Sequence, residues 1–351
     1  MASSSSSSAT AAAAALAAAE KVRRFSWDIV PDARHASPPR QRSNSIVRRL
    51  VVDTVMSKTA RQIQRKTSSS WLFVTPPAEV SFAKIVVHEA LHEGLASSVY
   101  RASTGAGFVF ALKTIAVPYE NARQHREMID AILLAEALGV HANIVAHLGH
   151  DMRDVRCYRQ FMAYHPDNLM RHLSAASPPL EAARVIDAAV QIARALTFIH
   201  AAQIIHRDVK CENVLLEIDR GSDENAQPRE VFKLSDLLEC CAVVRGGVYR
   251  ANIGTPGFMA PEVYSDTDDE CAYGQSADVW SFGMLLRQLV TREFPPPEVS
   301  RSGVRPRLPE GADVCSPAIS SLYVWCTERA PSMRTRLSDV LLALEALEAK
   351  K

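Results

Sequence analysis

The chain has 351 residues, 47% of them apolar, and its 40 Lys and Arg nearly balance its 39 Asp and Glu, giving a net charge of +1. This length allows one large domain or two smaller ones, and no apolar run approaches the roughly eighteen residues of a transmembrane segment. The seven cysteines form no C-x-x-C pair, which predicts reduced thiols in an intracellular, cytoplasmic protein and disfavours a disulfide framework or a cysteine-based zinc site.

Residues 1–70 form a basic arm of low complexity. The first twenty residues are mostly Ser and Ala, and residues 21–70 carry twelve Lys or Arg against three Asp. A segment of this composition has too little apolar surface to order itself, so we expect a disordered arm. Two alternatives are a basic amphipathic helix at 46–66, which would dock an acidic partner or an anionic surface, and an organelle transit peptide.

The pattern changes from about residue 71. Residues 82–91, 108–117 and 158–164 are rich in β-branched and aromatic residues and predict strands, whereas residues 122–138 predict a helix. After residue 165 the chain is mainly helical, with a long helix expected over 177–200. Strands first and helices later predict an α+β fold with two lobes, residues 71–164 and residues 165–351.

A polar cluster interrupts two apolar runs at 204–216, in the sequence IIHRDVKCENVLL. Buried polar groups are costly unless paired, so this cluster needs a structural network or a ligand. Four motifs follow one another: H-R-D-x-K-x-x-N at 206–213, S-D-L-L at 235–238, G-T-P-G-F-M-A-P-E at 254–262 and D-V-W-S-F-G at 278–283. In this order they resemble the protein kinase family over roughly residues 82–349. The resemblance implies a bilobal fold with a small β-rich N-lobe and a larger helical C-lobe.

The resemblance also implies phosphoryl transfer from ATP with Mg²⁺. Asp208 would accept the proton of the substrate hydroxyl, and Lys210 would place positive charge near the transferring group. Asn213 and Asp236 would bind magnesium, while Lys113 would hold the α- and β-phosphates. The rest of the nucleotide pocket would come from Leu91, Gly94, Val99, Ala111, Phe161, Met162, Tyr164 and Leu215.

Three departures from the family pattern concern the phosphates and the metal. His92 and Ser97 replace two glycines of the phosphate-covering loop, which should weaken that cover. Leu238 replaces the glycine of D-F-G, which should stiffen the segment after Asp236 or bias it to one conformation.

The third departure is the helix acid that should pair with Lys113. Counting from the motif at 141–145 places Asp130 there, and Glu127 one turn earlier could substitute for it. Glu136 is expected to be solvated surface.

Lys210 and Thr255 together resemble Ser/Thr kinases, and residues 305–311 and 326–344 resemble the tyrosine-kinase-like group. The resemblance implies that Arg334 pairs with Glu262 and that Asp278 holds the backbone of the H-R-D loop. The resemblance also implies that Arg207 would bind a phosphate on the activation segment, the stretch between Asp236 and Ala260. The implied partners are protein substrates with Ser or Thr, and no nucleic acid.

Two functional hypotheses therefore stand. One is an active Ser/Thr protein kinase that uses Mg-ATP, which the complete set Lys113, Asp208, Asn213 and Asp236 favours. The other is a catalytically impaired pseudokinase scaffold that acts through partners, which the lost glycines, Leu238 and the doubtful helix acid favour.

Overall fold

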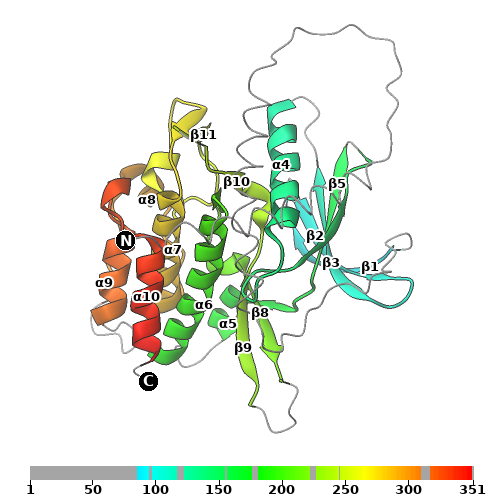
Figure 1. Ribbon diagram of the computed structural model, residues 1–351, viewed down its shortest axis with the longest axis horizontal. Coiled ribbons are helices and arrows are strands. Elements are labelled where there is room, and N and C mark those ends of the chain that lie inside the picture. The colour runs from blue at the N-terminus through cyan, green and yellow to red at the C-terminus, as the bar shows by residue number, and fades with distance from the viewer. Residues whose placement is uncertain are drawn as a thin grey trace, which may run out of the picture.

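The computed structural model describes residues 85–94, 97–116, 122–154, 156–175, 181–221, 227–244, 246–309 and 317–349. The predicted basic arm at 1–70 lies outside these residues. The described chain forms a lobe dominated by a sheet and one helix, followed by a larger helical lobe (Figure 1). The predicted α+β bilobal fold is thereby confirmed. Within the described ranges, no helix is both long enough and apolar enough to cross a membrane.

The N-lobe is built on a five-stranded antiparallel sheet with the order β1-β2-β3-β5-β4. The strands are β1 (Ile85–Glu93), β2 (Ser97–Thr104), β3 (Val109–Ala116), β4 (His147–Asp151) and β5 (Cys157–Met162). Sequence patterns predicted β1, β3 and β5 but missed β2 and β4. Both missed strands are rich in polar residues, so they lack the apolar signal of a buried strand.

The two faces of this sheet have different tasks. Successive side chains of a strand point to opposite faces, and residues paired across strands share a face. Phe110, Leu112 and Phe161 pack together with Ala102 on one face. Ala111 pairs with Met162 and Lys113 pairs with Gln160, so these four residues lie on the opposite face.

Helix α4 (Ala122–Leu138) matches the predicted helix and connects the lobes. Ile132 packs with Ile115 and Tyr158 of the sheet, whereas Ala131 and Ala135 belong to the core of the helical lobe. The helix therefore contributes side chains to both cores, and it separates the sheet from the C-lobe in Figure 1.

The C-lobe surrounds α6, a 20-residue helix that is buried over most of its length. The described part of this helix begins at Ala182, and the start predicted at Ser177 lies outside the described residues. The other helices are α5 (Leu169–Ala175), α7 (Ser276–Thr291), α8 (Glu298–Ser302), α9 (Pro317–Cys326) and α10 (Leu337–Glu348), with α6 at Ala182–Ala201. Helix α10 packs along α6, and α9 packs on α7.

Short strands and 3-10 helices line the junction between the lobes. One sheet has the order β6-β8-β9, and two further pairs are β7 with β10 and β11 with β12. Their bounds are β6 (Asp167–Asn168), β7 (Ile204–Ile205), β8 (Val214–Asp219), β9 (Arg229–Leu234), β10 (Cys241–Ala242), β11 (Val248–Arg250) and β12 (Glu270–Ala272). The 3-10 helices are η1 (Cys211–Asn213), η2 (Leu237–Glu239), η3 (Pro261–Val263) and η4 (Pro331–Met333).

Candidate active site

The polar loop at 206–213 lies between the buried strand β7 and the strand β8, and it is anchored by Asp278 of α7. The two carboxylate oxygens of Asp278 accept hydrogen bonds from the backbone N–H groups of His206 and Arg207, both at 2.8 Å. Burial acts to raise the pKa of Asp278, but its hydrogen bond with His200 and the nearby imidazoles outweigh burial and lower that pKa. Arg207 has a positive φ of 73°, an unfavourable conformation that these paired backbone contacts hold in place.

Asp208 is the centre of a charged network at this loop. Its Oδ2 accepts hydrogen bonds from Lys210 Nζ at 2.8 Å and from Asn213 Nδ2 at 2.7 Å. Its Oδ1 accepts a hydrogen bond from the Thr255 hydroxyl at 2.6 Å, and Lys210 also donates to that hydroxyl at 2.5 Å. A carboxylate offers about four lone-pair sites, so these three donors leave Asp208 the capacity to accept one more proton donor.

Thr255 reaches Asp208 because its neighbour is a glycine. Gly254 has φ = 105°, and a Cβ at this position would collide with the backbone oxygen of Arg207. Only glycine allows both this conformation and this close approach. The backbone thus brings together Asp208, Lys210 and Thr255, residues 47 positions apart at the extremes.

Lys113 and Asp236 form an ion pair across the two lobes. Lys113 Nζ donates to Asp236 Oδ1 at 2.7 Å, and the lysine side chain is 8% exposed. Burial acts to raise the pKa of Asp236, but the charge and hydrogen bond of Lys113, together with His206 and Lys210, lower it below its usual value. Asp236 is therefore an ionised carboxylate at neutral pH, as a metal ligand must be.

The predicted pairing of Lys113 with an acid of α4 is corrected by these contacts. Asp130 is exposed on α4. Glu127 accepts a hydrogen bond from Arg123 at 3.0 Å and lies 3.5 Å from Arg250. The partner of Lys113 is Asp236. One turn beyond Glu127, the buried position of α4 is Ala131, which has no carboxylate to offer.

Val99, Ala111 and Met162 lie on the sheet face that carries Lys113, where the nucleotide was predicted. Leu215 of β8 alternates with Val214 and Leu216, which are buried in the helical core, so Leu215 faces the other way. Leu91 lies near the end of β1 and Tyr164 just after β5, and both are half-buried.

Phe161 is the exception among the predicted pocket residues. It packs edge-to-face on Phe110 with ring centroids 5.7 Å apart, on the far side of the sheet. Its expected place at the back of the pocket is wrong by one residue. One position of error in a strand moves a side chain to the opposite face.

A small pocket lies beside Asp236, and only some of the residues that line it were predicted from the sequence. It is lined by Ala135, Val145, His147, Gln160, Met162, Leu234, Ser235, Asp236 and Leu237. Burial lowers the pKa of His147 to about 4, so this imidazole is neutral at neutral pH. The polar Gln160 could have been found only from the register of β5 against Lys113, which no local pattern supplies.

Gly94 closes the turn between β1 and β2, with its N–H bonded to Ser97 O at 3.0 Å. A Cβ on Gly94 would lie 3.1 Å from that oxygen and 3.2 Å from His92 Nε2. A side chain at Gly94 would therefore fit tightly in a turn that already contains His92.

Leu238 is accommodated more easily than its replacement of a glycine suggested. It lies in η2 and is absent from the positive-φ residues of the described chain, whereas Asp236 itself adopts φ = 61°. Leu238 packs against the cluster formed by Ile115, Ile132 and Tyr158. The segment after Asp236 is thus attached to α4 by apolar packing, without backbone strain at Leu238.

The motif at 254–262 ends at Glu262, whose position is fixed by Arg334. The guanidinium of Arg334 donates to the two oxygens of Glu262 at 2.5 and 2.8 Å, and it also lies over the ring of Trp280. Arg207 donates to the carbonyl of Glu239 and, at 3.2 Å, to the hydroxyl of Tyr273.

Comparisons with known proteins agree with this geometry. A family model described as "Protein kinase domain" matches residues 85–343. The chain is 29% identical over 222 residues to a probable serine/threonine-protein kinase of Dictyostelium discoideum, a match covering 60% of this chain and 14% of that protein. It is 30% identical over 159 residues to serine/threonine-protein kinase STE20 of Eremothecium gossypii (42% and 15%). It is also 42% identical over 105 residues to probable serine/threonine-protein kinase WNK8 of Oryza sativa subsp. japonica (30% and 14%). The chain thus spans well under two thirds of these relatives' lengths.

Proposed function

Because the chain belongs to the protein kinase family, we propose that it is a serine/threonine protein kinase, which transfers the γ-phosphoryl group of Mg-ATP to hydroxyls of protein substrates. The observation that carries this proposal is the network of Asp208, Lys210 and Thr255. A general base needs to be ionised and within reach of the proton that it accepts, and a cation beside it stabilises charge on the transferring group.

Each residue of this network then has a distinct role. Asp208 accepts the proton of the substrate hydroxyl and orients the oxygen for attack. Lys210 offsets negative charge on the transferring phosphoryl group. Thr255 fixes the position of both side chains through its hydroxyl. Together, Lys210 and Thr255 resemble Ser/Thr kinases, which favours a Ser or Thr substrate. The finer placement in the tyrosine-kinase-like group is part of this proposal and rests on sequence resemblance alone.

The donor set fits a nucleotide with Mg²⁺. The amide nitrogen of Asn213 is used in two hydrogen bonds to Asp208, which leaves the carbonyl oxygen of that side chain for a hard cation. Asp236 supplies an ionised carboxylate, and Lys113 beside it supplies positive charge for phosphates. Mg²⁺ would neutralise charge on the triphosphate. Leu91, Val99, Ala111, Met162, Tyr164 and Leu215 would enclose the adenine, with Gly94 at the phosphates.

A pseudokinase scaffold is the less favoured alternative. It drew on the lost glycines, on Leu238 and on the doubtful helix acid, and Lys113 does pair with Asp236 rather than with an acid of α4. Leu238, however, sits in an ordinary backbone conformation. The four groups that the chemistry uses directly are present, and the named relatives are serine/threonine kinases. These observations support an active enzyme.

The decisive test is Asp208→Asn in an assay that follows radiolabel from ATP into a generic basic protein. We expect the variant to lose about 10²–10⁴-fold in turnover, the usual contribution of a general base, with phosphoserine or phosphothreonine as the wild-type product. Asp339, exposed on α10, gives a matched control in Asp339→Asn. Equal rates in wild type and Asp208→Asn would refute the proposal.

A thermal-shift titration with ATP separates loss of chemistry from loss of fold. Asp208→Asn should keep the nucleotide-dependent rise in Tm, since Asp208 is assigned to the hydroxyl and not to the nucleotide. Loss of this shift together with activity would show that the variant had lost its nucleotide site.

We further propose an intracellular, cytoplasmic location. The cysteines of the described chain, Cys157, Cys211, Cys240, Cys241, Cys271 and Cys326, are free thiols, which suits a reducing compartment. Docking of the basic arm to an acidic partner or an anionic surface stays a prediction from composition.

A further inference from the structure

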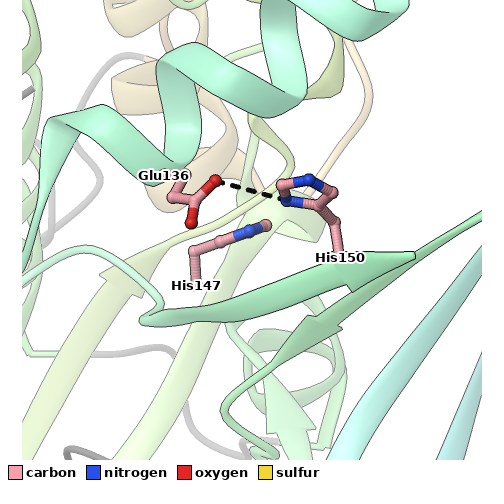
Figure 2. A group of neighbouring side chains, drawn as sticks. All are labelled: Glu136, His147 and His150. Carbon is pink, nitrogen blue, oxygen red and sulfur yellow. Dashed lines mark ion pairs between the residues drawn. The ribbon is translucent and has the colours of Figure 1, made fainter. Parts of the chain in front are cut away.

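Three potential metal ligands converge between α4 and β4 (Figure 2). Glu136 lies in the last turn of α4, and His147 and His150 lie on β4. One ligand atom from each lies within 4.8 Å of those of the other two. Glu136 was expected at the solvated surface, but the side chain of Glu136 is only 27% exposed and that of His150 only 14%. The pairing of β4 with β5 brings both imidazoles beneath the helix, which no local pattern predicts.

The converging atoms lack ordinary hydrogen bonds. Glu136 Oε2, His147 Nε2 and His150 Nδ1 are each buried without a hydrogen-bond partner in the described chain. Glu136 Oε2 and His150 Nδ1 are 3.3 Å apart, which is long for a hydrogen bond (Figure 2). Leaving buried polar atoms unpaired is unfavourable, and three such atoms facing one another form a ready set of lone pairs for a cation.

The spacing and chemistry of the three groups suit a transition metal ion. Two ligands that each lie about 2.0–2.1 Å from a tetrahedral zinc ion are about 3.3 Å apart, which matches the Glu136–His150 distance. The ligand atom of His147 lies within 4.8 Å of the other two, so binding the same ion would require it to move closer to them. Two imidazoles with one carboxylate favour zinc and its neighbours over magnesium or calcium, which prefer oxygen ligands. A water molecule would complete the tetrahedron.

Gln160 is placed to orient one of the ligands. Its side-chain nitrogen Nε2 lies 3.0 Å from His147 Nδ1. A histidine that binds metal through Nε2 carries its proton on Nδ1 and donates it to a nearby acceptor. The amide oxygen and nitrogen exchange places by rotation of the group, so Gln160 can accept this proton when His147 binds an ion.

We propose that Glu136, His147 and His150 form a binding site for a divalent transition metal ion, with zinc preferred, that ties the C-terminal end of α4 to β4. Ala135, adjacent to Glu136, and His147 itself also line the pocket beside Asp236. The ion would therefore fix one wall of that pocket and the position of the helix end beside it.

The test is metal titration of the tag-free full-length chain after removal of bound ions with a chelator. CoCl₂ should bind at one ion per chain and give visible d–d bands without a thiolate charge-transfer band, and ZnCl₂ should displace it. Glu136→Gln and His150→Gln should each weaken cobalt binding by at least about tenfold. His88→Gln, at an exposed histidine of β1, is the matched control and should bind as wild type does.

Absence of stoichiometric binding, or an unchanged cobalt spectrum in both variants, would overturn the proposal. The Tm of each metal-free variant shows whether it is folded. If a variant fails to fold, X-ray absorption of the zinc-loaded wild type decides: nitrogen and oxygen ligands at about 2.0–2.1 Å support the site, and a sulfur shell at about 2.3 Å refutes it. None of these measurements depends on phosphoryl transfer. If the metal site is refuted, the proposed kinase activity is therefore unaffected.

Discussion

Lys113 and Asp236 are paired with each other at 2.7 Å, although each is assigned to a different part of the nucleotide complex. The lysine is assigned to phosphates and the carboxylate to a metal. The two charges satisfy one another, which avoids leaving a partly buried carboxylate unpaired. The proposed roles of Lys113 at phosphates and of Asp236 at a metal require this pair to be shared or opened.

The first prediction concerns the pH dependence of this pair. A carboxyl whose pKa is lowered in the folded state adds stability above its unfolded pKa, and this stability is lost as the pH falls through the folded pKa. Lys113→Met removes the main cause of the lowered pKa of Asp236. We expect the variant to be less stable than wild type at pH 7, and the difference to shrink as the pH falls below about 4.

Urea unfolding of the nucleotide-free proteins between pH 7 and pH 3 measures this difference. When Lys113→Met is instead introduced into an Asp236→Asn protein, its effect on stability should be independent of pH, since the titrating group is absent from both proteins that are compared. A stability difference between Lys113→Met and wild type that stays constant with pH would contradict the assignment.

At the scale of elements, the N-terminal half of α4 is attached to the paired strands β11 and β12 by two ion pairs. Arg123 lies 2.6 Å from Glu270 of β12, and Glu127 lies 3.5 Å from Arg250 of β11. Glu127 precedes the buried Ala131 by one turn, so it lies on the stripe of α4 that faces the site. These ion pairs thus occupy Glu127, the carboxylate of α4 that was considered as an alternative partner of Lys113.

We predict that Arg250→Gln raises kinase activity modestly. Without Arg250, Glu127 can turn toward Lys113 and release Asp236 for its assigned metal. Both side chains of the Glu127–Arg250 pair are partly exposed, and such a pair contributes up to about 1 kcal/mol, so the gain should not exceed about fivefold. Initial rates at saturating ATP measure the effect, with the exposed Arg153→Gln as control. A fall in rate would show that the contact between Arg250 and Glu127 supports activity.

Leu238 joins η2 to the sheet side of α4 through apolar packing. Leu238→Gly removes this side chain and adds backbone freedom, so we expect a loss of about 2–4 kcal/mol in the free energy of unfolding and an altered turnover number. Leu238→Met keeps most of the volume and should cost less than about 1.5 kcal/mol. Chemical unfolding and steady-state rates measure both variants. Equal stability of wild type and Leu238→Gly would mean that η2 does not depend on this contact.

At the scale of the whole molecule, Glu262 and Arg334 join η3 to the chain beyond η4. The pair is bidentate, Arg334 is 7% exposed, and the two residues lie 72 positions apart. Breaking one side of such a buried pair leaves the other charge uncompensated, which costs about 3–5 kcal/mol.

Glu262→Gln should therefore destabilise the fold by about this amount. Glu345→Gln removes a partly exposed ion pair with Arg194 and should cost no more than about 1 kcal/mol. Denaturant unfolding of the two variants gives the comparison, and similar losses in both would argue against a special role for Glu262 and Arg334.

The sequence by itself determined the features that depend on residues close together in the chain. The helix at 122–138 follows from the local sequence pattern, and three of the sheet strands follow from their content of β-branched and aromatic residues. The H-R-D loop and its neighbouring motifs indicated the fold through their resemblance to the protein kinase family. The same resemblance named Lys113, Asp208, Asn213 and Asp236.

Only the tertiary structure decided which side chains meet across elements. The partner of Lys113 depends on how α4 and η2 pack, and the two faces of β5 depend on its register against β3. The cluster of Glu136, His147 and His150 exists because β4 pairs beneath the end of α4. Such contacts are set by packing and strand register over long sequence separations, where a shift of one residue exchanges the two faces of a strand.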